Sequence, residues 1–286
     1  MFTHRLVGLI GLACWTVSGW GQLPSHTPIP GGLAAVELGP ADLPKPTAHF
    51  GQHPVLVVKD RGRWTGIVGL GLDIVPGRYI VRTTDQDHVA NAHEFTVRAH
   101  RYRVTQPQPA AKKMRGKRPA PVILSDITYD RAVRALPQQR FEDTPHLPLR
   151  LPVDGVGFND RFGEREVDEQ TNSRPIRFLE FNLPTEHVVL APGTGRVIGV
   201  LNHASGDVVA IDHGMGLLSI LWPISGVTVK ANENVARGAN LGLPAPQSDS
   251  STAQLRWSVA LNREFVNPRL LIENRSANAS RHAVSR

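Results

Sequence analysis

The sequence predicts a mainly β protein of two domains joined by a Pro-rich, basic connector. At 286 residues the chain is long enough for two domains, each with its own core. Its 26 Gly and 23 Pro separate many short apolar runs, and no stretch sustains the apolar spacing of a helix. Short apolar runs bounded by turn residues are typical of strands, so both domains are expected to be built from sheets.

The first 21 residues are expected to be a signal peptide. Residues 1–5 are short and basic, and residues 6–17 form an apolar run too short to span a bilayer. Small residues follow, which favours cleavage near Gly21; a retained anchor and lipidation at Cys14 are the alternatives. No later segment is long and apolar enough to cross a membrane. The sequence therefore predicts a periplasmic or secreted protein without disulfides, since Cys14 is its only cysteine.

Residues 28–104 are expected to form a small β-sandwich-like domain. A DRGR turn separates two β-rich runs, and a Pro-Gly turn precedes the next. The expected strands are residues 55–59, 64–68, 78–82 and 94–98. Three histidines nearby are spaced as in no known metal template, so they are expected at the surface: His88, His93 and His100.

Residues 105–151 are expected to connect the domains. Proline-rich sequence flanks a basic cluster, which consists of Lys112, Lys113, Arg115, Lys117 and Arg118. Such a run is usually a solvated, mobile segment, and it also suits contact with an anionic polymer. Ser125 is placed as the N-cap of a short helix over residues 126–136 that ends at Pro137, and this helix could simply pack against one domain. The net charge of +7 favours polyanionic partners, but no motif indicates nucleic-acid binding.

Residues 152–272 are expected to form a second antiparallel β domain. Turns rich in Gly, Asn and Pro separate its apolar runs at short intervals. The expected strands are residues 196–201, 207–211, 217–221, 227–230 and 255–261. The last segment, residues 273–286, is polar and small, which predicts a disordered tail.

Several short segments of the second domain occur in a recognisable order. They are Phe162-Gly163, Pro175, Pro184, Ala191-Pro192, Gly195-Arg196-Val197, Asp212-His213-Gly214 and the residues from Trp257 to Pro268. With this spacing the domain resembles the lysostaphin/LytM-type zinc endopeptidases, which cleave peptide cross-links in bacterial cell walls. The first domain looks like the small β domain that precedes some members, through Pro30-Gly31-Gly32, Gly62-Arg63-Trp64 and Ile67-Val68-Gly69. The resemblance implies a LytM/lysostaphin-type fold for residues 152–272 and a structural role for His213.

The same resemblance places unsuitable residues where the family has its zinc site. The three ligand positions hold Ile176, Glu180 and Arg256, and the two catalytic histidine positions hold Pro223 and Gln254. A catalytic zinc needs about three protein ligands and a bound water. Isoleucine has no lone pair, and arginine is a fixed cation without an acceptor. No cofactor is therefore expected, and no catalytic residue is assigned.

Two further hypotheses concern this site. His187 and His203 could contribute to a rebuilt metal site, but their spacing matches no zinc motif and both are expected on exposed loops. Glu180 and Arg256 are expected to form an ion pair in which the guanidinium takes the place of the metal cation. The alternative is that Arg256 points to solvent and backbone donors cap Glu180. The candidates for a binding groove are Glu180, Arg256, Trp222 and Trp257.

The expected function is that of an exported, catalytically inactive relative that binds or regulates in cell-wall remodelling. Inactive relatives of the family act as activators or scaffolds, so peptidoglycan or a cell-wall hydrolase is the expected partner. One alternative is an active peptidoglycan endopeptidase with a non-standard zinc site. The other is a structural subunit of an envelope complex.

Overall fold

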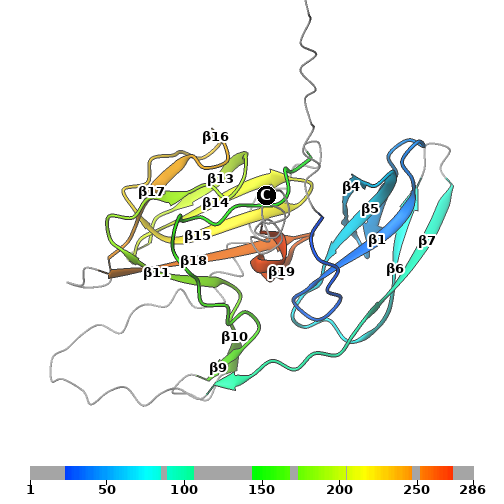
Figure 1. Ribbon diagram of the computed structural model, residues 1–286, viewed down its shortest axis with the longest axis horizontal. Helices are drawn as coiled ribbons and strands as arrows, with labels where there is room; N and C mark the ends of the chain where they lie inside the picture. Colours follow the sequence, from blue (N-terminus) through cyan, green and yellow to red (C-terminus); the bar gives the residue numbers. More distant parts are fainter. Residues whose placement is uncertain are drawn as a thin grey trace, which may run out of the picture.

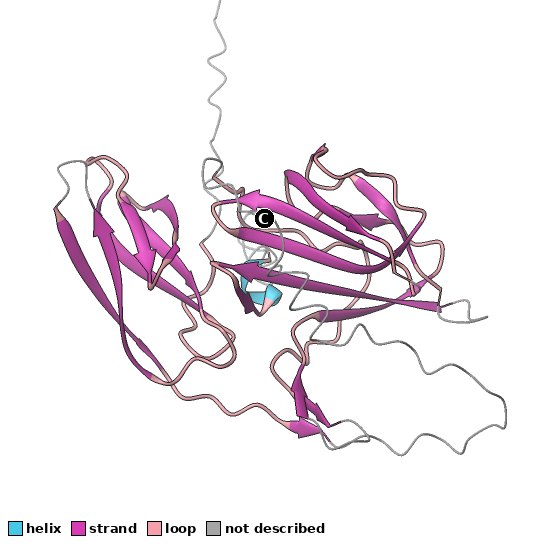
Figure 2. Ribbon diagram, turned by 180° about the vertical axis from the view of Figure 1, so that it is seen from behind, coloured by secondary structure: helices cyan, strands magenta, loops and turns pink. Residues whose placement is uncertain are grey.

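The protein is folded almost entirely from strands, which confirms the mainly β fold class (Figures 1 and 2). The computed structural model describes residues 23–84, 89–105, 144–167, 173–203, 205–246 and 252–272. Within these ranges the helical element is one short 3-10 turn, η1 (Pro268–Leu271), capped by Asn267. Figure 1 shows two lobes, with β1 to β7 in one and β11 to β19 in the other.

The first lobe contains two antiparallel sheets. One has the order β1-β5-β4 and the other the order β3-β2-β6-β7. Their strands are β1 (Leu33–Pro40), β2 (Thr47–Phe50), β3 (His53–Pro54), β4 (Leu56–Asp60), β5 (Arg63–Gly69), β6 (Gly77–Thr84) and β7 (Ala90–Val97). The DRGR turn joins β4 to β5 as expected, with positive φ at Arg61 and Gly62. Rings of Phe50, Tyr79 and Phe95 contact one another across β2, β6 and β7.

A small sheet joins the two lobes. It consists of β8 (Val104–Thr105), β9 (Arg165–Val167) and β10 (Ser173–Pro175), and β8 runs parallel to β9. Tyr102 precedes it and donates a hydrogen bond to the carbonyl of Pro30 (2.7 Å). The ring of Tyr102 lies against Gly163, where φ is +82° and an added Cβ would lie closer than 3.0 Å to the ring. The glycine of the Phe-Gly segment is therefore required for packing and for backbone conformation.

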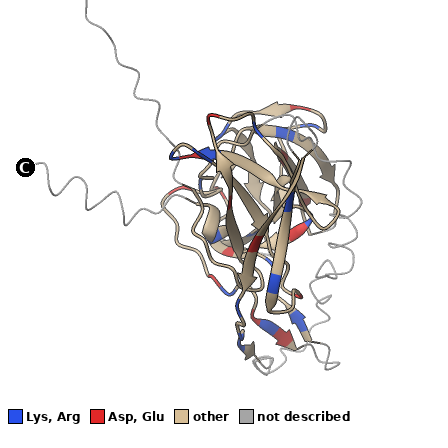
Figure 3. Cartoon of the chain, turned by 90° about the vertical axis from the view of Figure 1, so that its right-hand side faces the viewer, with Lys and Arg blue, Asp and Glu red and all other residues tan. Residues whose placement is uncertain are grey.

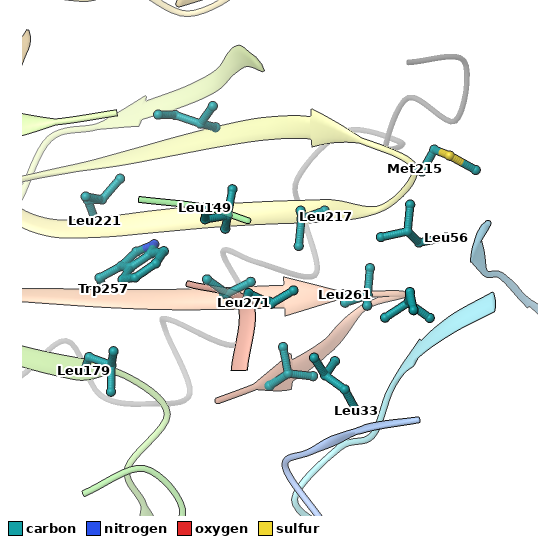
Figure 4. Packing of buried hydrophobic residues seen from close by; sticks show 14 of the residues in the cluster. Leu33, Leu56, Leu149, Leu179, Met215, Leu217, Leu221, Trp257, Leu261 and Leu271 are labelled. Atoms are coloured by element: carbon teal, nitrogen blue, oxygen red, sulfur yellow. The ribbon is translucent and has the colours of Figure 1, made fainter. Parts of the chain in front are cut away.

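The second lobe is built on one large sheet with the order β11-β18-β15-β14-β13-β16. In addition, β17 pairs with β12 and β15, and β19 pairs with β18. The strands are β11 (Leu179–Pro184), β12 (Val189–Leu190), β13 (Gly195–Leu201), β14 (Asp207–Gly214), β15 (Leu217–Ser225), β16 (Asn234–Val235), β17 (Asn240–Pro244), β18 (Thr252–Leu261) and β19 (Glu264–Val266). One face of the sheet carries large, fully buried side chains, among them Leu179, Leu221 and Trp257 (Figure 4).

One expected strand of this lobe is wrong. Residues 227–230 belong to no strand, and Gly226, at φ +56°, turns the chain directly after the end of β15. Thr228 instead fixes the loop to β17: its backbone N–H donates to Leu241 and its hydroxyl donates to Asn240. The buried side chain of Val229 explains why the segment resembles a strand in sequence.

The two lobes share one hydrophobic core. Leu33 and Leu56 of the first lobe belong to the same buried cluster as Leu217 and Leu261 of the second (Figure 4). Asn262, at the end of β18, closes this contact with two hydrogen bonds. Its Oδ1 accepts from the backbone N–H of Gly69 (2.6 Å), and its Nδ2 donates to the carbonyl of Gly69 (3.0 Å).

Several expectations concern residues outside the described ranges. They are the signal peptide (1–21), Cys14, His88, the basic cluster with the helix of residues 126–136, and the tail (273–286). Among the residues that the structure does describe, no helix is long and apolar enough to cross a membrane. Their Lys, Arg, Asp and Glu residues are interspersed along the strands and loops (Figure 3).

Candidate functional site

Arg256 lies at the centre of a row of three residues that crosses three neighbouring strands. On β18 it is directly opposite Glu180 of β11 on one side and Trp222 of β15 on the other. Successive side chains of a strand point to opposite faces, so these three share the face away from the main core. We call this surface the Arg256 face and define it by Glu180, Asn182, Trp222, Gln254 and Arg256.

The expected ion pair between Arg256 and Glu180 is present. The Nε atom of Arg256 donates to Oε2 of Glu180 at 3.3 Å, and the two side chains are 23% and 21% exposed. The guanidinium carbon also lies 4.8 Å from the ring centroid of Phe178 and 5.1 Å from that of Trp222. Cation–π contacts of this kind stabilise an arginine side chain in place. The alternative, in which Arg256 points freely to solvent, is therefore wrong.

Residues on either side of this row extend the Arg256 face. In the next row the side-chain amide of Gln254 donates to Asn182 Oδ1 at 3.4 Å. On the side of Trp222 that faces β14, a small apolar cluster of Val208, Ala210 and Ile220 is buried under partly exposed side chains that include Trp222. The face therefore combines a charged centre with amide groups on one side and apolar surface on the other.

Two of the family's functional positions are occupied by residues that pack into the protein. Ile176 is only 7% exposed; its backbone N–H donates to Glu164 and its carbonyl accepts from Gly163. Pro223 is buried in β15, and its carbonyl accepts from the N–H of Ala245. Neither side chain offers a lone pair to a metal or a group that transfers a proton.

The residues at the three ligand positions do not fit a zinc ion. Ile176 is apolar, Arg256 is a cation, and the carboxylate of Glu180 is already paired with that cation. Zinc sites in proteins use Cys, His, Asp or Glu ligands, about three of them in a catalytic site. Over the described ranges, no group of three or more such side chains lies together.

The two histidines considered for a rebuilt site make other contacts. His187 Nε2 lies 3.0 Å from the carbonyl of Asp154. The ring of His203 meets Trp222 edge-on, with centroids 6.2 Å apart, and its Nδ1 accepts from the N–H of Ser205. Both histidines lie on loops, as expected, and their side chains are partly exposed.

Trp257 does not belong to the Arg256 face, and its assignment as a groove residue is wrong. Its side chain is 0% exposed and points into the main core, where Nε1 donates to Ser219 Oγ at 3.2 Å. Strand alternation explains this, because a neighbour of Arg256 in β18 must point to the opposite face. The sequence contained that signal, since Leu255, Trp257 and Val259 alternate with Gln254, Arg256 and Ser258.

His213 belongs to a buried hydrogen-bond network on the core side. Its Nδ1 lies 2.9 Å from the carbonyl of Thr194, and its Nε2 lies 2.8 Å from Ser219 Oγ. Because a carbonyl only accepts, we assign the ring proton to Nδ1, so that Nε2 accepts from the hydroxyl of Ser219. Trp257 donates to the same hydroxyl. Burial lowers the pKa of His213, which favours this neutral ring.

Two contacts at the site were not anticipated from sequence. The ring of Phe178, which directly precedes β11, contacts the guanidinium of Arg256. Ser219 links His213 to Trp257 from the middle of an apolar run. A buried polar residue in such a run is a usable signal, because buried hydroxyls need partners.

Comparisons with known proteins agree with this architecture. Residues 26–100 match the model of the peptidase family M23 N-terminal domain, and residues 176–268 match the model of peptidase family M23. A solved putative M23 peptidase from Pseudomonas aeruginosa is 28% identical, with a TM-score of 0.65, over 86% of this chain and 95% of that one. Among curated proteins, none matches the chain.

Two more distant structures are also similar. A zinc-containing peptidase from Vibrio cholerae is 15% identical, with a TM-score of 0.38, over 76% of this chain and 84% of that one. The catalytic domain of a prophage-encoded M23 protein, EnpA from Enterococcus faecalis, is 16% identical, with a TM-score of 0.35, over 43% of this chain and 95% of that one.

Proposed function

The chain belongs to peptidase family M23, and from this premise we propose that it is an exported, catalytically inactive member that binds in the cell wall. Its proposed role is to bind or regulate during peptidoglycan remodelling, with peptidoglycan itself or a cell-wall hydrolase as partner. The observation that carries the proposal is the Arg256–Glu180 ion pair. Its two side chains stand at positions where the resemblance places metal ligands, and they form a cation and its counter-ion instead.

The ion pair opposes metal binding electrostatically. A divalent cation about 4 Å from the guanidinium of Arg256 would be repelled by roughly 8 kcal/mol at an effective dielectric constant of about 20, which cancels the attraction that Glu180 would supply at the same distance. To avoid this, Arg256 would have to leave Glu180 and the rings of Phe178 and Trp222. The same movement would leave Glu180 as one carboxylate, which is too few ligands for a zinc ion.

Catalysis is opposed for a second reason. Water attack on a peptide bond needs a general base and stabilisation of the developing oxyanion. Pro223 cannot transfer a proton, and the amide of Gln254 can only donate or accept hydrogen bonds. What remains is a partly exposed polar face on an intact sheet, which supports binding without turnover.

The proposal is tested with the purified protein in three measurements. Metal analysis after incubation with zinc chloride and gel filtration should give far less than one zinc per chain. Cross-linked wall fragments, separated by liquid chromatography before and after incubation, should remain uncleaved. Insoluble peptidoglycan should sediment the protein, in contrast to a chitin control without peptide stems.

The results separate the alternatives. One zinc per chain together with cleavage of cross-links would show an active peptidase and reject the proposal. No sedimentation with peptidoglycan would reject wall binding. In that case, capture of a cell-wall hydrolase from envelope extracts would still support a regulatory role, and a different partner of fixed stoichiometry would favour a structural subunit.

A further inference from the structure

We propose that Arg256 binds the free carboxylate of a peptide ligand on the Arg256 face. The inference deepens the proposed function by naming the chemistry of the ligand, and it rests on that function only in taking this face as the binding surface. Three properties of the guanidinium carry it: unused donors, a fixed orientation and a suitable charge.

Most hydrogen-bond donors of Arg256 have no acceptor in the described part of the protein. A guanidinium carries five N–H groups in one plane. The single hydrogen bond of the Arg256 side chain uses Nε, which donates to Glu180. The four N–H groups on the terminal nitrogens, Nη1 and Nη2, are left for a ligand, and the side chain is 23% exposed. These N–H groups can therefore donate to a ligand that reaches the Arg256 face.

The guanidinium is held in place before any ligand binds. Glu180 fixes it at Nε, and the rings of Phe178 and Trp222 lie within 4.8 Å and 5.1 Å of its central carbon. An arginine that is already ordered loses less conformational entropy on binding than a mobile surface arginine does. Trp222 is also ordered, because its ring packs on the apolar cluster of the same sheet face.

A carboxylate fits the remaining donors best. Two parallel N–H groups of a guanidinium match the two oxygens of a carboxylate in a bidentate pair. An ammonium group would be repelled by Arg256. A phosphate dianion would meet about twice the repulsion from Glu180 and also about twice the attraction of Arg256, so charge alone does not separate it from a carboxylate. The planar, bidentate geometry of the donors therefore suits a carboxylate, and the neighbouring residues decide what carries it.

The neighbouring residues favour a peptide as the carrier of this carboxylate. The next row of the face presents the side-chain amides of Gln254 and Asn182, which match the hydrogen-bonding groups of a peptide backbone. On the other side, Trp222 offers an aromatic surface for a small apolar side chain. Its Nε1 is buried and has no hydrogen-bond partner among the residues that the structure describes, so its environment is a sensitive reporter of changes at this face.

The test compares N-acetyl-alanyl-alanine as the free acid with the same dipeptide as its C-terminal amide, in both L and D forms. Binding is followed by calorimetry and by the NMR resonances of the Arg256 Nε–H and the Trp222 indole N–H. At least one free acid should bind about tenfold or more tightly than its amide, because a charged hydrogen-bonded pair is lost. Inorganic phosphate at equal concentration should compete weakly.

Two variants test whether the preference for the free acid depends on Arg256. Arg256→Gln should abolish the preference for the acid, and circular dichroism should show that it remains folded. Arg196→Gln is the matched control, because Arg196 is an arginine of β13 that bonds Asn232 elsewhere on the sheet. The control should keep the preference.

Three outcomes would overturn the inference. They are equal binding of acid and amide, no binding of either at millimolar concentration, and an unchanged preference in Arg256→Gln. These failures are separate from those of the proposed function. A zinc-free protein that sediments with peptidoglycan but does not distinguish acid from amide overturns the carboxylate site alone.

Discussion

Replacing Asn262 by glycine is expected to weaken the contact between the two lobes. Asn262 is 2% exposed, and it is the partner of both backbone polar groups of the buried residue Gly69. Without the amide, one N–H and one C=O lose their hydrogen bonds inside the core. An unsatisfied buried group costs about 1–3 kcal/mol, so two of them cost roughly 2–6 kcal/mol.

Asn262→Gly is expected to lower the free energy of unfolding by about 2–4 kcal/mol. This is the lower part of that range, because the missing side chain leaves room for a water molecule. Asn262→Ala should lower the free energy of unfolding by about 1 kcal/mol more, since φ at this position is +43° and a Cβ disfavours that conformation. In a protein of this size, about 2–4 kcal/mol lowers Tm by at least about 4 °C.

The assay is differential scanning calorimetry, with urea unfolding as an independent measure of stability. The control is Asn232→Gly, because Asn232 also has a positive φ (+72°) but lies exposed in a turn. Its stability should change by no more than about 0.5 kcal/mol. Equal shifts of Tm for Asn262→Gly and Asn232→Gly would refute the reasoning, because burial of the amide would then have no effect.

Two further predictions concern pH and packing. Burial lowers the pKa of His213, so below the unfolded-state pKa of about 6.5 the unfolded chain binds a proton that the folded chain does not, and stability falls as pH falls from there towards the folded pKa. Urea midpoints between pH 8 and pH 5 should fall more for the wild type than for His213→Asn, and parallel curves would contradict the assignment. Gly163→Ala should lower the free energy of unfolding by about 2 kcal/mol or more, because the new Cβ clashes with the ring of Tyr102 and because φ is positive at this position. The exposed control Gly157→Ala, where a Cβ meets nothing within 4 Å, should change little, and a similar loss for both would point to a general glycine effect.

Much of the sheet architecture could be predicted from local pattern. Residues 55–59 and 64–68 correspond to β4 and β5, and the DRGR turn between them needs the positive φ values that it has. Residues 227–230 mislead for a physical reason. The alternation of Val227 and Val229 with polar residues looks like a strand, and Val229 is buried. The hydrogen bonds of this segment to β17 nevertheless come from a loop, which residue type alone does not reveal.

The candidate site could be predicted only in part. The pairing of Glu180 with Arg256 follows from charge and from the strand positions implied by the resemblance, and the structure has it. The contact of Phe178 with Arg256 depends on how a loop enters β11, which no periodicity encodes. The hydrogen bond between Asn262 and Gly69 joins residues 193 positions apart. It forms only when the two lobes pack together, so no local sequence pattern predicts it.

The row of Glu180, Arg256 and Trp222 also constrains how the sheet can assemble. If β18 slipped by one residue against β11 and β15, Arg256 would enter the core and Trp257, now 0% exposed, would face water. Burying an unpaired guanidinium is far more costly than exposing an apolar side chain. The buried-face and exposed-face residues of β18 therefore also favour one alignment of these strands over its nearest competitors.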